Sequence, residues 1–213
     1  MIPGSAASIL LASAGSELVI GQAFEGGFYA GTITYNITNY DSWLRNTNGP
    51  SYHLVVAPKA SGEASTIRQY KTTATCDGAE LTQTSAQSYF DGYHNTYTSV
   101  IGSSNAHPAA NYCQALTIGG YSDWYLPANL EANLAFANLL DLSAWQVGGA
   151  EEFEVDGSSW FNGGYYWSST GYSCENTGNQ NGANGFITAS KTTIGGMPKN
   201  ESLWVRAIRR VAV

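Results

Sequence analysis

The segment Gly119-Gly120-Tyr121-Ser122-Asp123-Trp124-Tyr125-Leu126-Pro127 decides the predicted fold. Its two glycines end the preceding helix, since glycine adopts the left-handed conformation at low cost. Asp123 can accept backbone N–H bonds in a tight turn, and Pro127 opens the next helix. We predict a structural corner, in which Trp124 is buried and Asp123 pairs with Arg206. A metal-ligand role for Asp123 is the weaker alternative, because no second carboxylate lies nearby.

Two later segments extend this framework. Tyr165-Tyr166-Trp167-Ser168-Ser169-Thr170 alternates rings with small polar residues, which predicts a strand whose Trp167 fills the core. Trp204-Val205-Arg206-Ala207-Ile208-Arg209-Arg210 predicts a last strand that presents Arg206 and Arg210 on one face. We expect these arginines to stack on rings or to pair with acids inside the protein. A site for an external anion is the alternative.

The order of predicted elements indicates the fold class. Apolar and β-branched runs, bounded by Gly, Pro and Asn, predict strands over residues 28–35, 52–57, 165–169, 186–190 and 203–211. Helices are expected over 91–101 and 107–116. A third is expected after Pro127, with an apolar stripe of Leu130, Leu134 and Ala137 that Phe136, Leu139 and Leu140 widen. Loops are expected over 36–51, 59–90, 145–164 and 170–185. Strands, then helices, then strands predict an α+β domain with a mostly antiparallel sheet.

Composition favours recognition through neutral polar contacts. Charged residues make up 12% of the 213 residues, while there are 14 Tyr and 24 Gly. Tyr supplies a large amphipathic contact area at low entropic cost, as in antibody paratopes. The net charge of −7 argues against nucleic-acid binding, because phosphate neutralisation needs clustered Lys and Arg.

Residues 1–20 are apolar and small, and none of the first 44 residues is Lys or Arg. A secretory signal needs a positively charged start, and the apolar run is too short to span a membrane. We therefore expect an arm that packs against a neighbouring subunit and no membrane insertion. A leader without fixed structure is the alternative.

Few residues suggest chemistry. Cys76, Cys113 and Cys174 leave two possibilities open, one disulfide or three free thiols, and no C-x-x-C spacing suggests zinc. We expect no metal, no cofactor and no catalytic residue. The histidines at 53, 94 and 107 are isolated. The acidic run 151–154 is typical of a solvated face. A glycosidase pair drawn from Glu151, Glu152, Glu154 and Asp156 is the weaker alternative.

Several of these segments resemble one family. The runs 110–127, 167–170 and 205–211, together with Gly26-Gly27-Phe28-Tyr29 and Leu54-Val55-Val56-Ala57-Pro58, are similar to the C-terminal domain of bacterial collagen-like adhesins. Related domains occur in phage tail fibres and other virion proteins. The resemblance covers residues 21–213 and implies a C-type-lectin-like fold related to formylglycine-generating enzymes. That fold has a twisted antiparallel sheet joining both termini, two to three helices and a long loop-rich lobe.

The chain also departs from this family and its relatives. The helix after Pro127 begins Ala128-Asn129-Leu130-Glu131-Ala132, where the family carries a more polar start with an acidic residue followed by Leu. Formylglycine-generating enzymes use two cysteines on copper, and only Cys174 lies in the C-terminal part. The calcium-binding motifs of true C-type lectins are missing from the sequence. The resemblance therefore implies binding without catalysis.

The resemblance implies a phage virion protein of the fibre or tail-tip type, assembled in the host cytoplasm as a homotrimer, with residues 1–20 attaching it to other virion proteins. It would recognise a host surface receptor, a glycan. Rings and amides in the expected loops are the candidate contacts: Trp160, Phe161, Tyr172, Asn176, Asn179, Asn181 and Asn184. A structural decoration or cement protein of the capsid or tail is the alternative. A bacterial surface adhesin is a third possibility, which would require an export signal.

Overall fold

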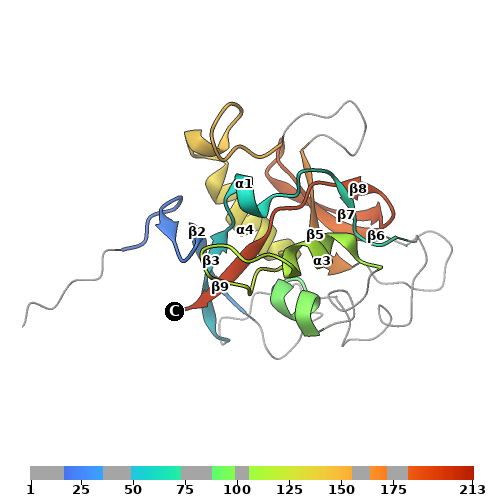
Figure 1. Ribbon diagram of the computed structural model, residues 1–213, viewed down its shortest axis with the longest axis horizontal. Coiled ribbons are helices and arrows are strands. Elements are labelled where there is room, and N and C mark those ends of the chain that lie inside the picture. The colour runs from blue at the N-terminus through green and yellow to red at the C-terminus, as the bar shows by residue number, and fades with distance from the viewer. Residues whose placement is uncertain (1–16, 36–48, 73–87, 99–105, 155–163, 172–181) are drawn as a thin grey trace, which may run out of the picture.

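The computed structural model describes residues 17–35, 49–72, 88–98, 106–154, 164–171 and 182–213 (Figure 1). These residues form a mixed α+β domain, as the order of predicted elements indicated. Of the expected N-terminal arm, only residues 17–20 lie within the described part. None of the helices in the described part is long and apolar enough to cross a membrane.

The first sheet brings the two ends of the described chain together. Its strand order is β1-β2-β3-β9, with β1 at Ala23–Phe24, β2 at Gly27–Thr34, β3 at Ser51–Val56 and β9 at Ile208–Ala212. All three pairings are antiparallel. The sharp turn before β2 needs Gly26, whose φ is +84°. The predicted strands 28–35 and 52–57 are confirmed, each shifted by one residue.

The second sheet has the order β5-β6-β7 and is also antiparallel. Its strands are β5 at Tyr165–Gly171, β6 at Gly182–Ile187 and β7 at Thr192–Pro198. The expected loop 170–185 is therefore wrong at both ends. The residues of β7 were not predicted as a strand, because two adjacent glycines interrupt an exposed edge segment with little apolar alternation.

The predicted strand 203–211 is divided in the structure. Its beginning, β8 at Ser202–Leu203, pairs with β4 at Arg68–Gln69 to form a separate two-stranded sheet. The chain then runs along the residues around α1, Lys59–Gly62, with Ala64 N bonded to Val205 O at 2.9 Å. It joins the first sheet only at Ile208. Arg206 lies in the segment that connects the β4-β8 sheet to the first sheet.

The helices match the predicted order but not every predicted face. The π-helix η2, His94–Thr98, and helix α3, Pro108–Gln114, fall within the two expected helical regions. Helix α4, Asn129–Leu139, follows Pro127, and a short 3-10 turn, η3, covers Ser143–Trp145. Helix α4 contacts β2 and β3 as well as β5, β6 and β7, so it lies between the two larger sheets (Figure 1).

The predicted apolar stripe of α4 is partly wrong. Leu130, Leu134 and Ala137 are only partly buried, although they pack against the core. Phe136, Leu139 and Leu140, which were expected to widen the stripe, are buried as predicted. The small residues Ala132 and Ala135 are also fully buried, because sheets cover α4 on two sides.

The core has two parts that meet along the last segment of the chain. One surrounds Trp124, Trp167 and Val205, beside α3. The other lies between α4 and the sheets and includes Tyr125, Phe136 and Ile208. The predicted burial of Trp124 and Trp167 is confirmed, since neither is exposed.

Candidate functional site

The segment 119–127 forms the structural corner that its sequence predicted. Gly119 and Gly120 adopt φ values of +62° and +86°, and Trp124 Nε1 donates to Tyr121 O at 3.1 Å. Tyr125 exchanges two backbone hydrogen bonds with Ile208, at 2.8 and 3.0 Å. The carbonyl of Pro127 accepts from Ser169 N at 2.7 Å. The corner therefore joins the other two segments on which the fold prediction rested.

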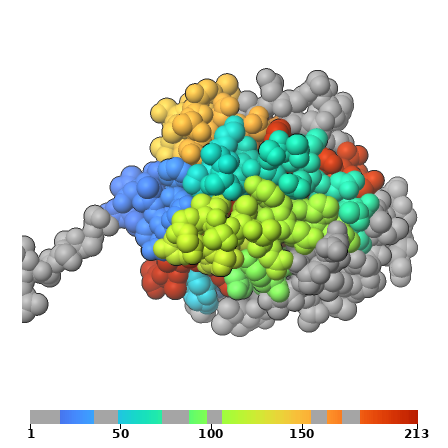
Figure 2. All heavy atoms as spheres, in the orientation of Figure 1, coloured from blue at the N-terminus to red at the C-terminus, as the bar shows by residue number. Residues whose placement is uncertain are grey.

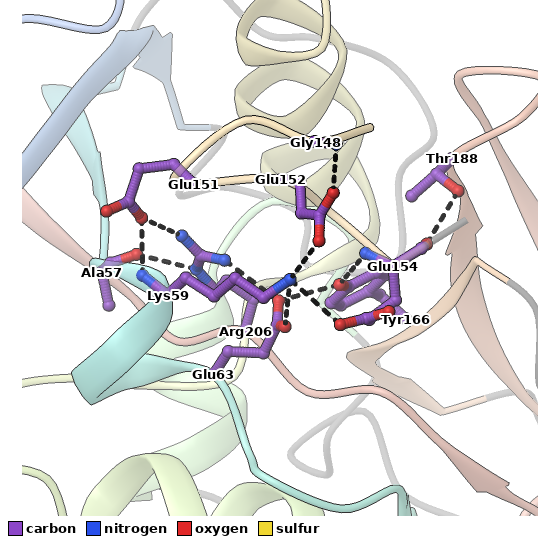
Figure 3. Close-up of polar contacts among 10 residues, drawn as sticks. All are labelled: Ala57, Lys59, Glu63, Gly148, Glu151, Glu152, Glu154, Tyr166, Thr188 and Arg206. Carbon is purple, nitrogen blue, oxygen red and sulfur yellow. Dashed lines mark hydrogen bonds and ion pairs between the residues drawn. The ribbon is translucent and has the colours of Figure 1, made fainter. Parts of the chain in front are cut away.

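Arg206 is the centre of the largest group of charged residues in the described part of the chain (Figure 3). Its side chain is 0% exposed, and its Nε donates to Ala57 O at 2.8 Å. The terminal nitrogens donate to Glu63 Oε2 at 3.0 Å and Glu151 Oε2 at 2.7 Å. The guanidinium also lies 5.1 Å from the Trp145 ring centre and 5.4 Å from that of Phe153. The predicted internal role of Arg206 is confirmed.

Lys59 is the second cation of this group. Its Nζ lies 3.0 Å from Glu154 Oε1, 3.4 Å from Glu152 Oε1 and 3.9 Å from Glu63 Oε1. Its backbone N donates to Glu151 Oε2 at 2.6 Å. We call these six residues, Lys59, Glu63, Glu151, Glu152, Glu154 and Arg206, the Arg206 cluster. It holds four carboxylates and two cations, and the cations lie between the acids (Figure 3).

The cluster fastens residues 148–154 to the start of α1 and to the last segment of the chain. Glu63 Oε2 also accepts from the Tyr166 hydroxyl at 2.8 Å. Burial raises the pKa of Glu63 above its usual value, and Arg206 opposes that rise. The acidic run is therefore not the solvated face that its sequence predicted. As for the glycosidase pair, Glu151, Glu152 and Glu154 all accept from fixed cations in this structure, and Asp156 lies outside the described residues.

The neighbouring arginines have separate acidic partners. Arg209 donates to both carboxylate oxygens of Asp123, at 2.8 and 3.1 Å, and stacks on the Tyr121 ring at 3.8 Å. The predicted pairing of Asp123 with Arg206 is therefore wrong. Arg206 points toward α1 and residues 145–153, whereas Arg209 lies on β9 beside the corner. Asp123 thus has a structural role, with a different arginine.

Arg210 lies in a cage of tyrosine rings. Its guanidinium is 4.6 to 5.1 Å from the ring centres of Tyr93, Tyr52 and Tyr35, and its Nη1 donates to Asp91 Oδ1 at 2.8 Å. Desolvation opposes the charged form of Arg210, but the neighbouring Asp91 stabilises it. All three arginines of the last segment are thus held by carboxylates of the same chain, which favours the internal interpretation over the external anion site.

A buried carboxylate, Glu131, was not identified from the sequence. It is the third residue of α4, and its Oε2 accepts from Ala128 N at 2.8 Å and Gly92 N at 3.0 Å. Its Oε1 accepts from the Tyr125 hydroxyl at 2.8 Å and from the Tyr35 hydroxyl. Burial raises the pKa of Glu131 to about 7, with the nearby Asp91 adding to the rise. An acid at the third position of a helix is a known N-terminal signal, so part of this arrangement could have been found.

The predicted ligand-binding residues are mostly outside the described part. Six of them, Trp160, Phe161, Tyr172, Asn176, Asn179 and Asn181, are in this category. Asn184 is described and lies in β6, where it is 2% exposed and its carbonyl accepts from the Ser168 hydroxyl at 2.9 Å. The expected loop position of Asn184 is therefore wrong, and its side chain does not reach the surface.

The described residues fix both ends of the segments 73–87 and 172–181, and the Ala106 end of the segment 99–105. Thr72 N donates to Ala106 O at 2.8 Å. The Thr170 hydroxyl donates to Ser88 O at 2.9 Å, and Tyr70 OH donates to Ser169 O at 3.1 Å. Gly182, which follows the last of these segments, pairs with Pro198, and Lys71 N donates to Lys199 O at 2.9 Å. These five attachment points, at Thr72, Ser88, Ala106, Gly171 and Gly182, therefore lie together beside the Gly171 end of β5.

The segment 155–163 attaches elsewhere. Thr188 connects the residues on both sides of it, since its hydroxyl lies 3.2 Å from Glu154 O and 3.1 Å from Gly164 O. These residues lie at the Tyr165 end of β5. Seven strand residues span roughly 20 Å, so the predicted contacts of the two segments attach at opposite ends of one strand.

Metal and thiol chemistry finds little support among the residues described. Within 17–35, 49–72, 88–98, 106–154, 164–171 and 182–213, no group of three or more His, Cys, Asp or Glu side chains is arranged to hold a metal ion. Cys113 is a free, buried thiol in α3, and burial raises its pKa far above the ordinary value. Cys76 and Cys174 lie outside the described part. No family model, curated protein or solved structure matches this chain.

Proposed function

We propose that this chain is a phage virion protein of the fibre or tail-tip type that recognises a glycan receptor on the host surface without catalysis. Its fold would be C-type-lectin-like, with residues 21–213 forming the domain. The α+β architecture supports this, because the first sheet holds both the first and the last strand described. The proposal also draws on the sequence resemblance and on the neutral, tyrosine-rich composition.

The observation that carries the proposal is the shared attachment region of three segments. Residues 73–87 and 172–181 begin and end beside the Gly171 end of β5, and residues 99–105 end there, on residues held by hydrogen bonds. Binding residues are found disproportionately on connecting segments that a rigid scaffold positions. Their Ser, Thr, Asn and Gly content suits hydrogen bonding to sugar hydroxyls.

The framework itself supports binding more than chemistry. In the Arg206 cluster the carboxylates accept from Arg206 or Lys59. A general acid or base needs a group that can exchange a proton with a substrate. Carboxylates that accept from these two cations instead stabilise the segment that carries them, which here is 148–154.

The proposed receptor contacts fall into two groups. Trp160 and Phe161 form the first, and Tyr172, Asn176, Asn179 and Asn181 form the second. Since the groups attach at opposite ends of β5, we do not expect one small ligand to contact both groups of residues. We place the receptor site with the second group, beside the shared attachment region.

Assembly is proposed to occur through residues 1–20 as a homotrimer. Val19, in the described end of this arm, is 65% exposed. A large exposed apolar side chain next to an apolar segment without Lys or Arg fits a contact with another subunit. Trimerisation would give avidity to sites that are individually weak.

The test is adsorption of the purified protein to host cells, with and without surface polysaccharide. We expect saturable binding that is lost on removing the polysaccharide. The combined variant Y172A/N176A/N179A/N181A should lose it, and W160A/F161A should retain most of it. Asn200→Ala is the matched control, because Asn200 is exposed outside both groups. Unchanged adsorption by the combined variant would refute the assigned site.

The alternative is a decoration or cement protein of the capsid or tail. The copy number in the particle distinguishes it from a fibre or tail-tip protein. A few trimers per virion are expected for a fibre or tail tip. Hundreds of copies, together with no binding of the folded oligomer to host cells, would establish decoration and overturn the proposed function.

A further inference from the structure

Arg68 differs from the other arginines of the described chain. Arg206, Arg209 and Arg210 each pair with a carboxylate of this protein. Arg68 has no carboxylate within ion-pair distance among the described residues, and its Nε is buried without a hydrogen-bond acceptor there.

The position of Arg68 is nevertheless fixed. Its backbone lies in β4, paired with Leu203 of β8, and its carbonyl accepts from Trp167 Nε1 at 2.8 Å. Its guanidinium carbon lies 4.7 Å from the ring centre of Tyr112, on α3. Segments 59–72 and 106–121, which carry Arg68 and Tyr112, are neighbours on the face shown in Figure 2. Arg68 and Tyr112 are both partly exposed.

This geometry leaves the terminal N–H donors of Arg68 without an acceptor among the described residues, beside the Tyr112 ring. An arginine that stacks on an aromatic ring keeps its N–H bonds in the guanidinium plane, pointing away from the ring. A planar carboxylate can meet such a fork with two parallel hydrogen bonds. Burial raises the pKa of Tyr112, and the negative charge of Glu63 adds to that rise. The Glu63 carboxylate, however, already accepts hydrogen bonds from Arg206 and Tyr166. No described acid therefore competes for the fork.

We propose that Arg68 and Tyr112 form a binding site for a carboxylate, carried by an acidic sugar of the receptor glycan. The guanidinium would take the carboxylate, and the exposed part of the Tyr112 ring would contact the sugar. The identity of the sugar rests on the proposed function, whereas the carboxylate site rests only on the geometry of Arg68. The site is separate from the residues proposed above as receptor contacts.

The probe is a glucuronic-acid disaccharide, compared with the glucose disaccharide of the same linkage. Binding is followed by NMR, through the side-chain Nε–H signal of Arg68 and the backbone signals of β4 and α3. The intact chain should show a saturable shift with the acidic sugar, weakened by salt, and little shift with the neutral one. Arg68→Gln should weaken binding about tenfold or more, the range expected for a charge-assisted hydrogen-bond pair.

Matched variants separate this site from general charge effects. Lys191→Gln removes one positive charge from an exposed side chain paired with Asp141, and it should leave binding unchanged. Tyr112→Phe keeps the ring and should retain binding, whereas Tyr112→Leu should weaken it. Arg68 has no ion pair among the described residues, so its variant should keep the wild-type melting temperature.

The possible results distinguish this inference from the proposed function. If Arg68→Gln binds the acidic sugar as well as the intact chain does, or if the neutral sugar binds equally, the carboxylate site is refuted. Host adsorption could still be abolished by the variants at 172–181, and the proposed function would then stand. If Arg68 binds glucuronate but the folded oligomer does not adsorb to cells, the site stands and the proposed function fails.

Discussion

Arg209 and Asp123 are joined by two hydrogen bonds, from Nε to Oδ1 at 2.8 Å and from Nη2 to Oδ2 at 3.1 Å. This bidentate pair ties β9 to the corner at 119–127. The Arg209 side chain is 8% exposed and that of Asp123 is 42% exposed. The arginine is thus the buried partner, and Tyr121 covers it at 3.8 Å. Removing the acid would leave a nearly buried cation with only the Glu25 contacts for compensation.

We expect Asp123→Ala to lower the free energy of unfolding by about 1 to 2 kcal/mol, because a charge-assisted pair is lost while solvent screens its exposed side. Urea unfolding followed by Trp fluorescence measures this change. The matched control is Asp141→Ala, since the Asp141–Lys191 pair is exposed on both sides and should contribute almost nothing. Equal losses in the two variants would show that the corner does not depend on this pair.

The Arg206 cluster predicts a much larger effect. Arg206→Met should destabilise the fold by about 3 to 5 kcal/mol, because buried Glu63 and partly buried Glu151 lose their closest cation, and Lys59 Nζ lies 3.9 Å from Glu63. Arg206→Lys should recover only part of this, since one ammonium cannot reproduce three differently directed guanidinium bonds. Chemical unfolding of the three proteins in parallel gives the order.

A second substitution tests the cause of that loss. In the Arg206→Met background, Glu63→Gln should restore some stability, because a neutral amide near Tyr166 costs less than an unpaired carboxylate. In the wild-type background the same change should destabilise, since it removes the partner of Arg206. If Glu63→Gln destabilises equally in both backgrounds, the loss comes from packing against Trp145 and Phe153, and not from charge.

The corner and the central strands could be predicted because their signals are local. Trp124 and Trp167 are large apolar residues in runs bounded by glycine and proline, and both are fully buried. The pairing of arginines with acids could not be predicted in the same way. The last segment holds three arginines within five residues, Arg206, Arg209 and Arg210. Their acidic partners depend on where the chain leaves β8 and enters β9.

Contacts between residues far apart in the chain explain why the sequence did not reveal the environments of Glu131 and Asn184. Glu131 carries a local signal through its bond to Ala128 N, but the Tyr35 hydroxyl is 96 residues away in the chain. A sequence pattern cannot show that such groups meet. Asn184 was assigned to a surface loop because Asn and Gly predominate around it, yet β5 and β7 enclose it on both sides. The composition of this segment therefore wrongly indicated that Asn184 is exposed.

Cys113 should be chemically inert in the folded protein. It is fully buried, and burial raises the pKa of its thiol, so little thiolate is present at neutral pH. Alkylation with iodoacetamide, followed by peptide mass spectrometry, should leave Cys113 unmodified under native conditions and modify it fully in denaturant. Rapid native alkylation would show that α3 opens readily. Cys113→Ser should cost about 1 to 3 kcal/mol if the new hydroxyl finds no partner.

Glu131 predicts the pH dependence of stability. Burial raises the pKa of its carboxyl to about 7 in the folded protein, above the value near 4.5 expected when the chain unfolds. The folded state therefore holds this proton more tightly. The stabilisation is fully present below about pH 4.5 and is lost as the pH rises through 7, by up to about 3 kcal/mol. Carboxylates in ion pairs, such as Asp91 with Arg210, act in the opposite direction at low pH.

Two substitutions isolate this contribution. Glu131→Gln can keep all four contacts, because its amide oxygen can accept from Gly92 N and Ala128 N while its NH₂ donates to the two tyrosine hydroxyls. We expect its unfolding free energy to match the wild type near pH 4 and to exceed it at pH 8. Glu131→Ala should be destabilised at every pH, since it leaves two backbone donors unpaired and opens a cavity. Parallel pH curves for the wild type and Glu131→Gln would contradict the raised pKa.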